Sequence, residues 1–260
     1  MADSLKFDSS SVPPSTFSDP LPAGAPAAHR LHARLVAFAE VLLCSGVPTQ
    51  TLIGIILQLA GWSVEQPTGR MSLPFVLTLS LADTLVLVAI MVALTRAHGE
   101  SATDLWLGTR SVRRETALGI LLIPVVFLGV VILLNALRLT APWLHNVPQN
   151  PLEQLAVTAS DAAMFAMVAI VAGGIREELQ RAFLLHRFEQ HLGGPAVGVV
   201  VLSVAFGFAH QLQGWDVAIT TGALGGFWAI VYLRRRSSVA PIVSHAGFNA
   251  LEILRVSLTS

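Results

Sequence analysis

The feature that most constrains the fold of this chain is a succession of long apolar blocks. Seven can be marked along the 260 residues, and most hold the roughly 20 residues that a helix needs to cross about 30 Å of hydrocarbon. Runs this long leave no period-two alternation, so they give no sign of β-strands. The sequence therefore predicts an all-α, polytopic membrane helix bundle of about seven transmembrane helices, at residues 35–60, 74–95, 116–137, 156–173, 195–211, 217–233 and 239–257.

The composition agrees with a bilayer as the solvent of this chain. Apolar residues make up 53% of it and charged residues only 12%, about half the usual share of a soluble domain. The net charge is zero, so there is no broad basic field, and nucleic acid is not expected as a partner. Cys44 is the only cysteine, which excludes an intrachain disulfide and a cysteine-based zinc site.

The N-terminal segment differs from the rest of the chain. Residues 1–28 are rich in Ser, Pro, Ala and Asp and predict a disordered tail, because they offer little apolar surface to bury. Residues 29–260 are expected to form a single membrane domain. Its first block is interrupted by Glu40 and Pro48, which fits either one kinked helix or an interfacial helix followed by a short span.

The basic residues predict the orientation of the bundle. With seven spans, thirteen of the sixteen basic residues fall on the side of the N-terminal tail, in that tail and in the segments 96–115, 174–194 and 234–238. Only Arg70, Arg138 and Arg255 fall on the other side. The positive-inside rule then places the N-terminus in the cytoplasm and the C-terminus on the far side.

Three pairs of side chains within or beside apolar blocks attract attention, since ionisable groups in a membrane are costly without a partner or a function. Each pair is four residues apart, so its members lie on one helical face, one turn apart. Three helices can in this way direct polar groups into one central space. The pairs are Glu177 and Arg181 with Glu178 beside them, Phe206 and His210, and His245 and Asn249.

Such a set has a coherent chemistry. A carboxylate can act as a general base toward water. Histidine can polarise that water, bind a metal or donate to a developing oxyanion, and asparagine can supply a second donor. Glu177, His210 and His245 would also satisfy the three-ligand pattern of a catalytic Zn²⁺ with one open position, so one divalent metal is a candidate cofactor.

Structural alternatives remain open for the same residues. Glu177, Glu178 and Arg181 could form a solvated ion pair on a cytoplasmic helix, and His210 could be an ordinary interfacial histidine. Asp83 and Asp161, inside the second and fourth blocks, are each expected to be a buried, hydrogen-bonded carboxyl group, with a proton-relay group as the alternative. The histidines of the tail and loops, His186 among them, carry no functional expectation.

In this order and spacing the motifs resemble the CPBP family of intramembrane proteases, which comprises the CAAX prenyl endopeptidases and bacterial relatives including bacteriocin-immunity-type (Abi) proteins. The resemblance covers about residues 156–255. It implies an intramembrane endopeptidase with its site within the bilayer, in a multi-pass protein of the cytoplasmic membrane of a bacterium. Its partner would be a membrane-associated protein or peptide substrate, a class that includes prenylated and lipid-anchored ones. A non-catalytic immunity or scaffold protein of the same fold is the alternative.

The resemblance also implies roles for the residues. Glu177 would belong to the carboxylate that activates water, His210 would help to hold the water or a metal, and His245 and Asn249 would stabilise the tetrahedral oxyanion.

One departure concerns the first motif, which in the family reads Glu-Glu-x-x-x-Arg. If Arg181 is matched, Arg176 replaces the first glutamate and Glu178 is an extra carboxylate; if the two glutamates are matched, Arg181 comes one residue early. The i,i+4 geometry of Glu177 and Arg181 favours the first alignment.

The apolar map sets a geometric condition for one common site. It places Glu177 near the inner edge of the membrane and His210 near the outer edge. A shared site therefore requires that the fourth helix extend beyond Gly173–Gly174, or that the fifth tilt or break.

Overall fold

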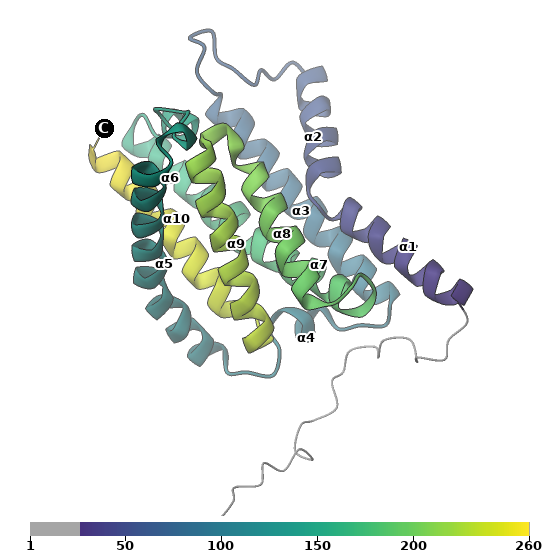
Figure 1. Ribbon diagram of the computed structural model, residues 1–260. Coiled ribbons are helices and arrows are strands. Elements are labelled where there is room, and N and C mark those ends of the chain that lie inside the picture. Colours follow the sequence, from purple (N-terminus) through teal and green to yellow (C-terminus); the bar gives the residue numbers. More distant parts are fainter. Residues whose placement is uncertain (1–26, 260) are drawn as a thin grey trace, which may run out of the picture.

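The protein is described by a computed structural model over residues 27–259, and the chain is helical through most of that range (Figure 1). No strand occurs among these residues. The helices longer than one turn are α1 Ala27–Leu43, α2 Val47–Leu59, α3 Leu73–Ala97, α4 Ala102–Trp106, α5 Val112–Thr140, the 3-10 helix Pro151–Leu155, α6 Ala159–Val168, the π-helix Ala169–Arg176, α7 Glu177–His191, α8 Pro195–Ala209, α9 Trp215–Arg235 and α10 Val239–Thr259.

The helices confirm the predicted all-α membrane bundle, whereas the predicted number of seven spans is not confirmed. Each apolar block corresponds to one helical pass, meaning a helix or consecutive helices that run from one end of the bundle to the other. Successive passes run in alternating directions (Figure 1). Within the described residues, five stretches are long and apolar enough to cross a bilayer. They are Ala27–Leu59, Leu73–Ala97, Val112–Thr140, Ala159–His191 and Trp215–Arg235. The pass formed by α8 has only 15 residues.

The first pass is broken between α1 and α2. Gly46 adopts a left-handed conformation with φ of 86°, which glycine tolerates without a Cβ clash, and Pro48 follows in the first turn of α2. α1 packs against α7, and α2 packs against α3. The predicted tail, residues 1–28, lies outside the described residues except for Ala27 and Ala28, which begin α1.

The fourth pass corrects one sequence prediction. The segment 174–194, predicted as a cytoplasmic loop, continues the helix of α6 through the π-helix into α7. Its three arginines, Arg176, Arg181 and Arg187, are therefore buried in the bundle and do not lie in a loop. The extension of the fourth helix beyond Gly173–Gly174 is the first of the two geometries that a common site required.

Two glycines of the π-helix allow α10 to approach closely. A Cβ at Gly173 would lie 2.6 Å from Asn249 Nδ2, and a Cβ at Gly174 would lie 2.6 Å from the Ala246 Cβ. Any larger side chain here would push α10 away from the fourth pass. The π-helix and α10 therefore bring the Glu177 and His245 segments together.

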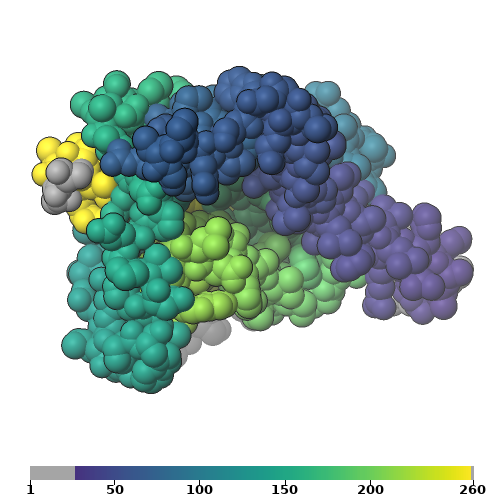
Figure 2. All heavy atoms as spheres, turned by 90° about the horizontal axis from the view of Figure 1, so that it is seen from above, coloured from purple at the N-terminus to yellow at the C-terminus, as the bar shows by residue number. Residues whose placement is uncertain are grey.

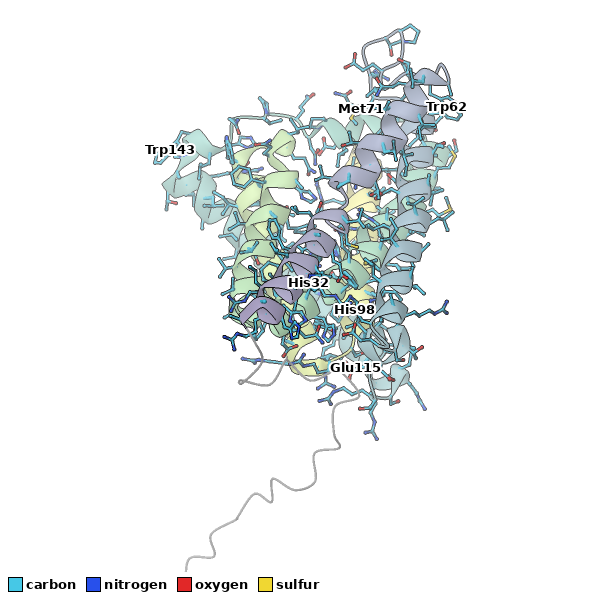
Figure 3. The ribbon with its side chains drawn as sticks, turned by 90° about the vertical axis from the view of Figure 1, so that its right-hand side faces the viewer. His32, Trp62, Met71, His98, Glu115 and Trp143 are labelled. Carbon is cyan, nitrogen blue, oxygen red and sulfur yellow. The ribbon has the colours of Figure 1, made fainter. Side chains whose placement is uncertain are left out.

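The bundle has two distinct ends. One end, here called the arginine-rich end, carries the start of α1, the segment 96–115, the α7–α8 turn and the α9–α10 turn; the opposite end carries 60–72, 141–158 and the α8–α9 turn (Figure 1). Figure 3 shows His98 and Glu115 near the arginine-rich end and Trp62, Met71 and Trp143 near the opposite end.

Candidate active site

A cavity of about 760 Å³ lies between α5, α6, the π-helix, α9 and α10. Glu177, His210, His245 and Asn249 all line it, although they come from three different passes: the start of α7, the end of α8 and α10. The rest of its wall is largely apolar, with Phe127, Phe165, Phe206, Trp228 and Phe248. The structure thus places these four predicted site residues on one cavity.

Glu178 lies at the buried end of the site. It is 2% exposed, and its Oε1 accepts hydrogen bonds from Arg181 Nη1 and, at 2.8 Å, from His245 Nδ1. The predicted i,i+4 pair of Glu177 and Arg181 is wrong, because Arg181 pairs with Glu178, three residues away. One residue turns a helix by about 100°, so Glu178 faces the packed interior while Glu177 faces the cavity. This geometry favours the alignment in which the two glutamates are matched.

His245 is held on three sides. Its ring stacks on Trp228 with centroids 3.8 Å apart and an interplanar angle of 14°, and its Nδ1 is bound to Glu178. The other ring nitrogen, Nε2, lies 4.0 Å from Glu177 Oε2. The Arg181 guanidinium lies at the same buried end of the site, 4.8 Å from the centroid of the Phe206 ring. His245 is thus fixed with Nε2 toward the cavity.

Glu177 is the more accessible of the two glutamates, with a side chain 19% exposed. Its Oε1 lies 3.4 Å from Arg176 Nη2. Arg176, in turn, lies 3.5 Å from Asp83 and donates to Gln180. Arg176 therefore does not occupy the place of a catalytic base and instead connects Glu177 to α3.

The Asp83 carboxylate is buried, 1% exposed, and accepts hydrogen bonds from Thr49 and Gln50 of α2. For Asp83 the expected buried and hydrogen-bonded carboxyl group is confirmed, whereas Asp161 is hydrogen-bonded but only partly buried, in a capping box with Thr158 at the start of α6. Gln180 also donates to the carbonyl of Cys44, at the break between α1 and α2. The first two passes thus support the residue that precedes Glu177.

His210 lies at the C-terminal end of α8. Its Nδ1 lies 2.8 Å from the Phe206 carbonyl oxygen. Because a carbonyl oxygen only accepts, Nδ1 must donate, which leaves Nε2 of the neutral ring as an acceptor. The Phe206 ring lies beside both histidines, with centroids 4.8 Å from His210 and 6.2 Å from His245.

Asn249 Nδ2 donates to the Ala169 carbonyl at 3.1 Å. An amide group has two N–H donors, so this hydrogen bond uses one and leaves the other for a ligand in the cavity.

The residues do not fit a three-ligand metal site in this arrangement. No group of three His, Cys, Asp or Glu side chains among residues 27–259 is placed to hold an ion. Glu177 and His245 face each other at 4.0 Å, while His210 lies across the Phe206 ring. The predicted ligand set Glu177, His210 and His245 is therefore not assembled as a zinc site.

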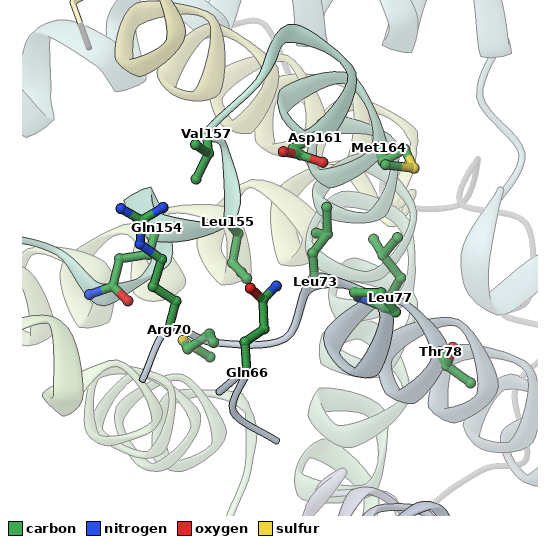
Figure 4. A pocket seen from close by; sticks show the side chains of 12 residues that line it. Gln66, Arg70, Leu73, Leu77, Thr78, Gln154, Leu155, Val157, Asp161 and Met164 are labelled. Carbon is green, nitrogen blue, oxygen red and sulfur yellow. The ribbon is translucent and has the colours of Figure 1, made fainter. Parts of the chain in front are cut away.

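A second cavity of about 630 Å³ lies between the 60–72 segment, α3 and α6 (Figure 4). Its polar lining residues lie among apolar ones and are Gln66, Arg70, Thr78, Gln154 and Asp161. It contains none of the residues that line the first cavity around Glu177, and it lacks a base beside a histidine.

Sequence reasoning missed a second buried cluster, on the same helix as Glu177. His186 and Arg187 of α7 contact Glu100, and Arg187 also contacts Glu40 of α1. His98 binds the other oxygen of Glu40. His186, read as an uninformative loop residue, is thus 5% exposed inside the bundle. The signal available was Glu40 inside an apolar block, which required a partner.

The ionised form of Glu100, which lies beyond the end of α3, is strongly stabilised. Burial opposes ionisation, but the hydrogen bond from His186 and the charge of Arg187 outweigh it and lower the pKa of Glu100 to about 2. This cluster is therefore a charged clamp between α1, the 98–101 segment and α7.

The fold and this geometry define a multi-pass integral membrane protein with a polar, carboxylate-containing cavity inside its helices. Residues 158–251 match the family model Rce1-like, described as type II CAAX prenyl endopeptidase Rce1-like. Over this part of the chain, the match confirms the resemblance to that protease family predicted from the three motifs. No curated protein and no solved structure matches the chain. The passes before residue 158 lie outside the family match.

Proposed function

We propose that this protein is an intramembrane endopeptidase that hydrolyses a peptide bond of a membrane-associated protein or peptide. The observation that carries the proposal is that two adjacent glutamates contact opposite sides of one histidine ring. Glu177 faces the cavity 4.0 Å from His245, and Glu178 holds the opposite nitrogen of that histidine in the packed interior.

The proposed first step is attack of water on the scissile carbonyl carbon. Glu177 takes a proton from the water as general base, and Nε2 of His210 accepts a hydrogen bond that orients the same water. Both residues line the cavity, and the hydrogen bond of His210 to Phe206 leaves Nε2 free to accept.

The oxyanion that forms is stabilised by His245 and Asn249. Glu178 binds Nδ1 and holds the ring so that Nε2, when it carries a proton, donates to the oxyanion, and the second N–H of Asn249 donates as well. Glu177 then returns its proton to the amide nitrogen, the C–N bond breaks, and an acid and an amine leave.

The alternative of a non-catalytic immunity or scaffold protein rested on Arg176 in place of a motif glutamate. Arg176 points to Asp83, and Glu177 and Glu178 are both present at the site. The geometry therefore favours the enzyme.

The test uses purified protein in lipid bilayers with a library of membrane-anchored peptides, and mass spectrometry to find new termini. Glu177→Ala and His210→Ala are each expected to lose nearly all cleavage while the protein stays folded. The matched control is Glu252→Ala, a carboxylate that also lines the cavity but pairs with Arg255 and should leave cleavage intact. Full biological function in Glu177→Ala, Glu178→Ala and His245→Ala would replace the enzyme with the scaffold.

A further inference from the structure

The cavity that holds Glu177 has a closed floor and an open rim. At the floor, the Trp228 indole is 1% exposed and stacks on His245. Beyond it toward the arginine-rich end, Arg235 and Glu115 form an ion pair between α9 and α5. No residue of the segments 96–115 or 234–238 lines the cavity.

The rim lies at the opposite end of the bundle. Residues of the 141–158 segment and the α8–α9 turn line it, among them His145, Asn150, Glu153 and Gln213. Asn150 donates to Gln213, which joins the two segments across the rim. Figure 2 views the molecule from this end and shows its surface hollowed between the blue, teal and green segments.

A buried carboxylate, that of Asp216, stabilises the rim. Asp216, 0% exposed, binds Arg138 at 3.0 Å and His145 at 2.9 Å, which fixes the end of α5 against the start of α9. The opening is therefore held by structured residues.

The two ends differ sharply in basic residues. In the described chain, apart from the three buried arginines of the fourth pass, the arginine-rich end has nine arginines and the rim end has three. The nine are Arg30, Arg34, Arg96, Arg110, Arg113, Arg114, Arg234, Arg235 and Arg236, and the three are Arg70, Arg138 and Arg255. The positive-inside rule places the end with more arginines in the cytoplasm, so the removal of the buried arginines leaves the predicted orientation unchanged.

We propose that the cavity opens on the non-cytoplasmic face of the membrane, and that the bond cut lies in a substrate segment on that side. The side on which the substrate is cut rests on the proposed function, whereas the direction in which the cavity opens does not. The substrate class is then a membrane-anchored protein or peptide with an extracytoplasmic juxtamembrane segment, rather than one with a cytoplasmic C-terminal tail.

The position of the rim relative to the membrane surface agrees with a substrate segment that lies close to its membrane anchor. Trp143 is 73% exposed beside it, and Trp215 begins α9 at the same end. Indole side chains favour the headgroup zone of a bilayer. The rim therefore lies near the membrane surface, so a peptide close to its membrane anchor can enter without a long extension into water.

Cysteine accessibility tests the direction of the opening. In a Cys44→Ala background, single cysteines replace Glu153 at the rim, Thr221 on the cavity wall and Arg113 at the opposite end. Intact cells are treated with a small thiol reagent that does not cross membranes, before and after permeabilisation. The expected result is labelling of Glu153→Cys and Thr221→Cys in intact cells, and of Arg113→Cys only after permeabilisation. The reverse pattern, or labelling of all three only after permeabilisation, overturns the proposal.

A substrate experiment keeps this result apart from the proposed function. The same cleavable peptide is placed on the cytoplasmic or the non-cytoplasmic side of a membrane anchor. Cleavage only on the non-cytoplasmic side is expected, and cleavage on the cytoplasmic side overturns the proposal. Labelling needs no activity and can be repeated in Glu177→Gln. If the rim labels as expected and neither peptide is cut, the orientation stands and the proposed function fails.

Discussion

Helix α7 carries two clusters built from the same residue types, and they differ in access to a cavity. Near its start, Glu178 and Arg181 meet His245, and Glu177 lies beside them on the cavity. Near its end, a sealed cluster joins its residues to α1 and the 98–101 segment, with His186, Arg187, Glu40, His98 and Glu100. Residue type alone therefore does not distinguish a catalytic centre from a structural clamp.

The comparison also shows what each cluster lacks. In the sealed cluster both carboxylates are less than 9% exposed and bind arginine or histidine, so no carboxylate is left to meet a substrate. In the cavity cluster Glu178 has the equivalent buried position, and Glu177 is the additional carboxylate. The cavity cluster thus differs by a second, accessible glutamate next to the buried one, and this glutamate is the proposed base.

The largest expected difference between the clusters is in catalysis by their histidines. His245→Ala should lower kcat by about two to three orders of magnitude, because it removes an oxyanion donor. His186→Ala, its counterpart in the sealed cluster, should leave kcat near that of the unmodified protein and lower Tm. Both are measured by peptide cleavage and thermal unfolding in the same lipid. Equal loss of kcat in the two variants would show that the two clusters do not differ in their contribution to catalysis.

A smaller effect on activity is expected at Arg176, which connects Glu177 to Asp83. Arg176→Gln should lower kcat more than it raises KM, since a misplaced base affects the transition state more than substrate binding. Arg176→Lys should recover part of the rate because it retains the charge. A change confined to KM would show that Arg176 acts on binding.

The sealed cluster should show its role in the pH dependence of stability. The pKa of Glu100 falls from 4.5 to about 2 in the folded protein, so its contribution to the free energy of unfolding is complete above about pH 4.5 and is lost as the pH falls toward 2. Glu100→Gln should thus lower Tm by a constant amount from pH 5 to 8, and the difference should shrink below pH 4.5. A difference that grows on acidification would contradict this account.

The smallest expected effect is that of a chelator. Because Glu177, His210 and His245 do not assemble a three-ligand site, prolonged treatment with EDTA should leave the cleavage rate unchanged. Loss of activity, with recovery on addition of Zn²⁺, would show that the histidines rearrange around a metal.

Much of the fold was predictable because membrane solvation leaves a strong signal in the sequence. Apolar runs located every pass, and their length excluded strands. The failure lay in the fourth pass, where Arg176, Arg181 and Arg187 look like loop residues by hydropathy. Some of their carboxylate partners lie on other passes, at Asp83 and Glu40, or beyond the end of α3, at Glu100, and such long-range pairs leave no periodic pattern.

The convergence of the candidate residues was predictable from the sequence, whereas their pairings were not. The spacing of His245 and Asn249, and of Phe206 and His210, predicted that these side chains face one space, and all four line the cavity. The partner of Arg181 was assigned wrongly, because i,i+3 and i,i+4 neighbours are equally close on an isolated helix. The packing of α10 decided between them, since His245 lies against Glu178.

The most direct test of this account compares the two adjacent glutamates, using the best substrate from the peptide library. Glu177→Gln should lose about two to four orders of magnitude in kcat with an unchanged Tm, because a general base is removed from an accessible position. Glu178→Gln should lose both kcat and Tm, because the orientation of His245 and the pairing of buried Arg181 depend on it. Near-normal kcat in Glu177→Gln, with loss of kcat at unchanged Tm in Glu178→Gln, would contradict the assignment of Glu177 as the base.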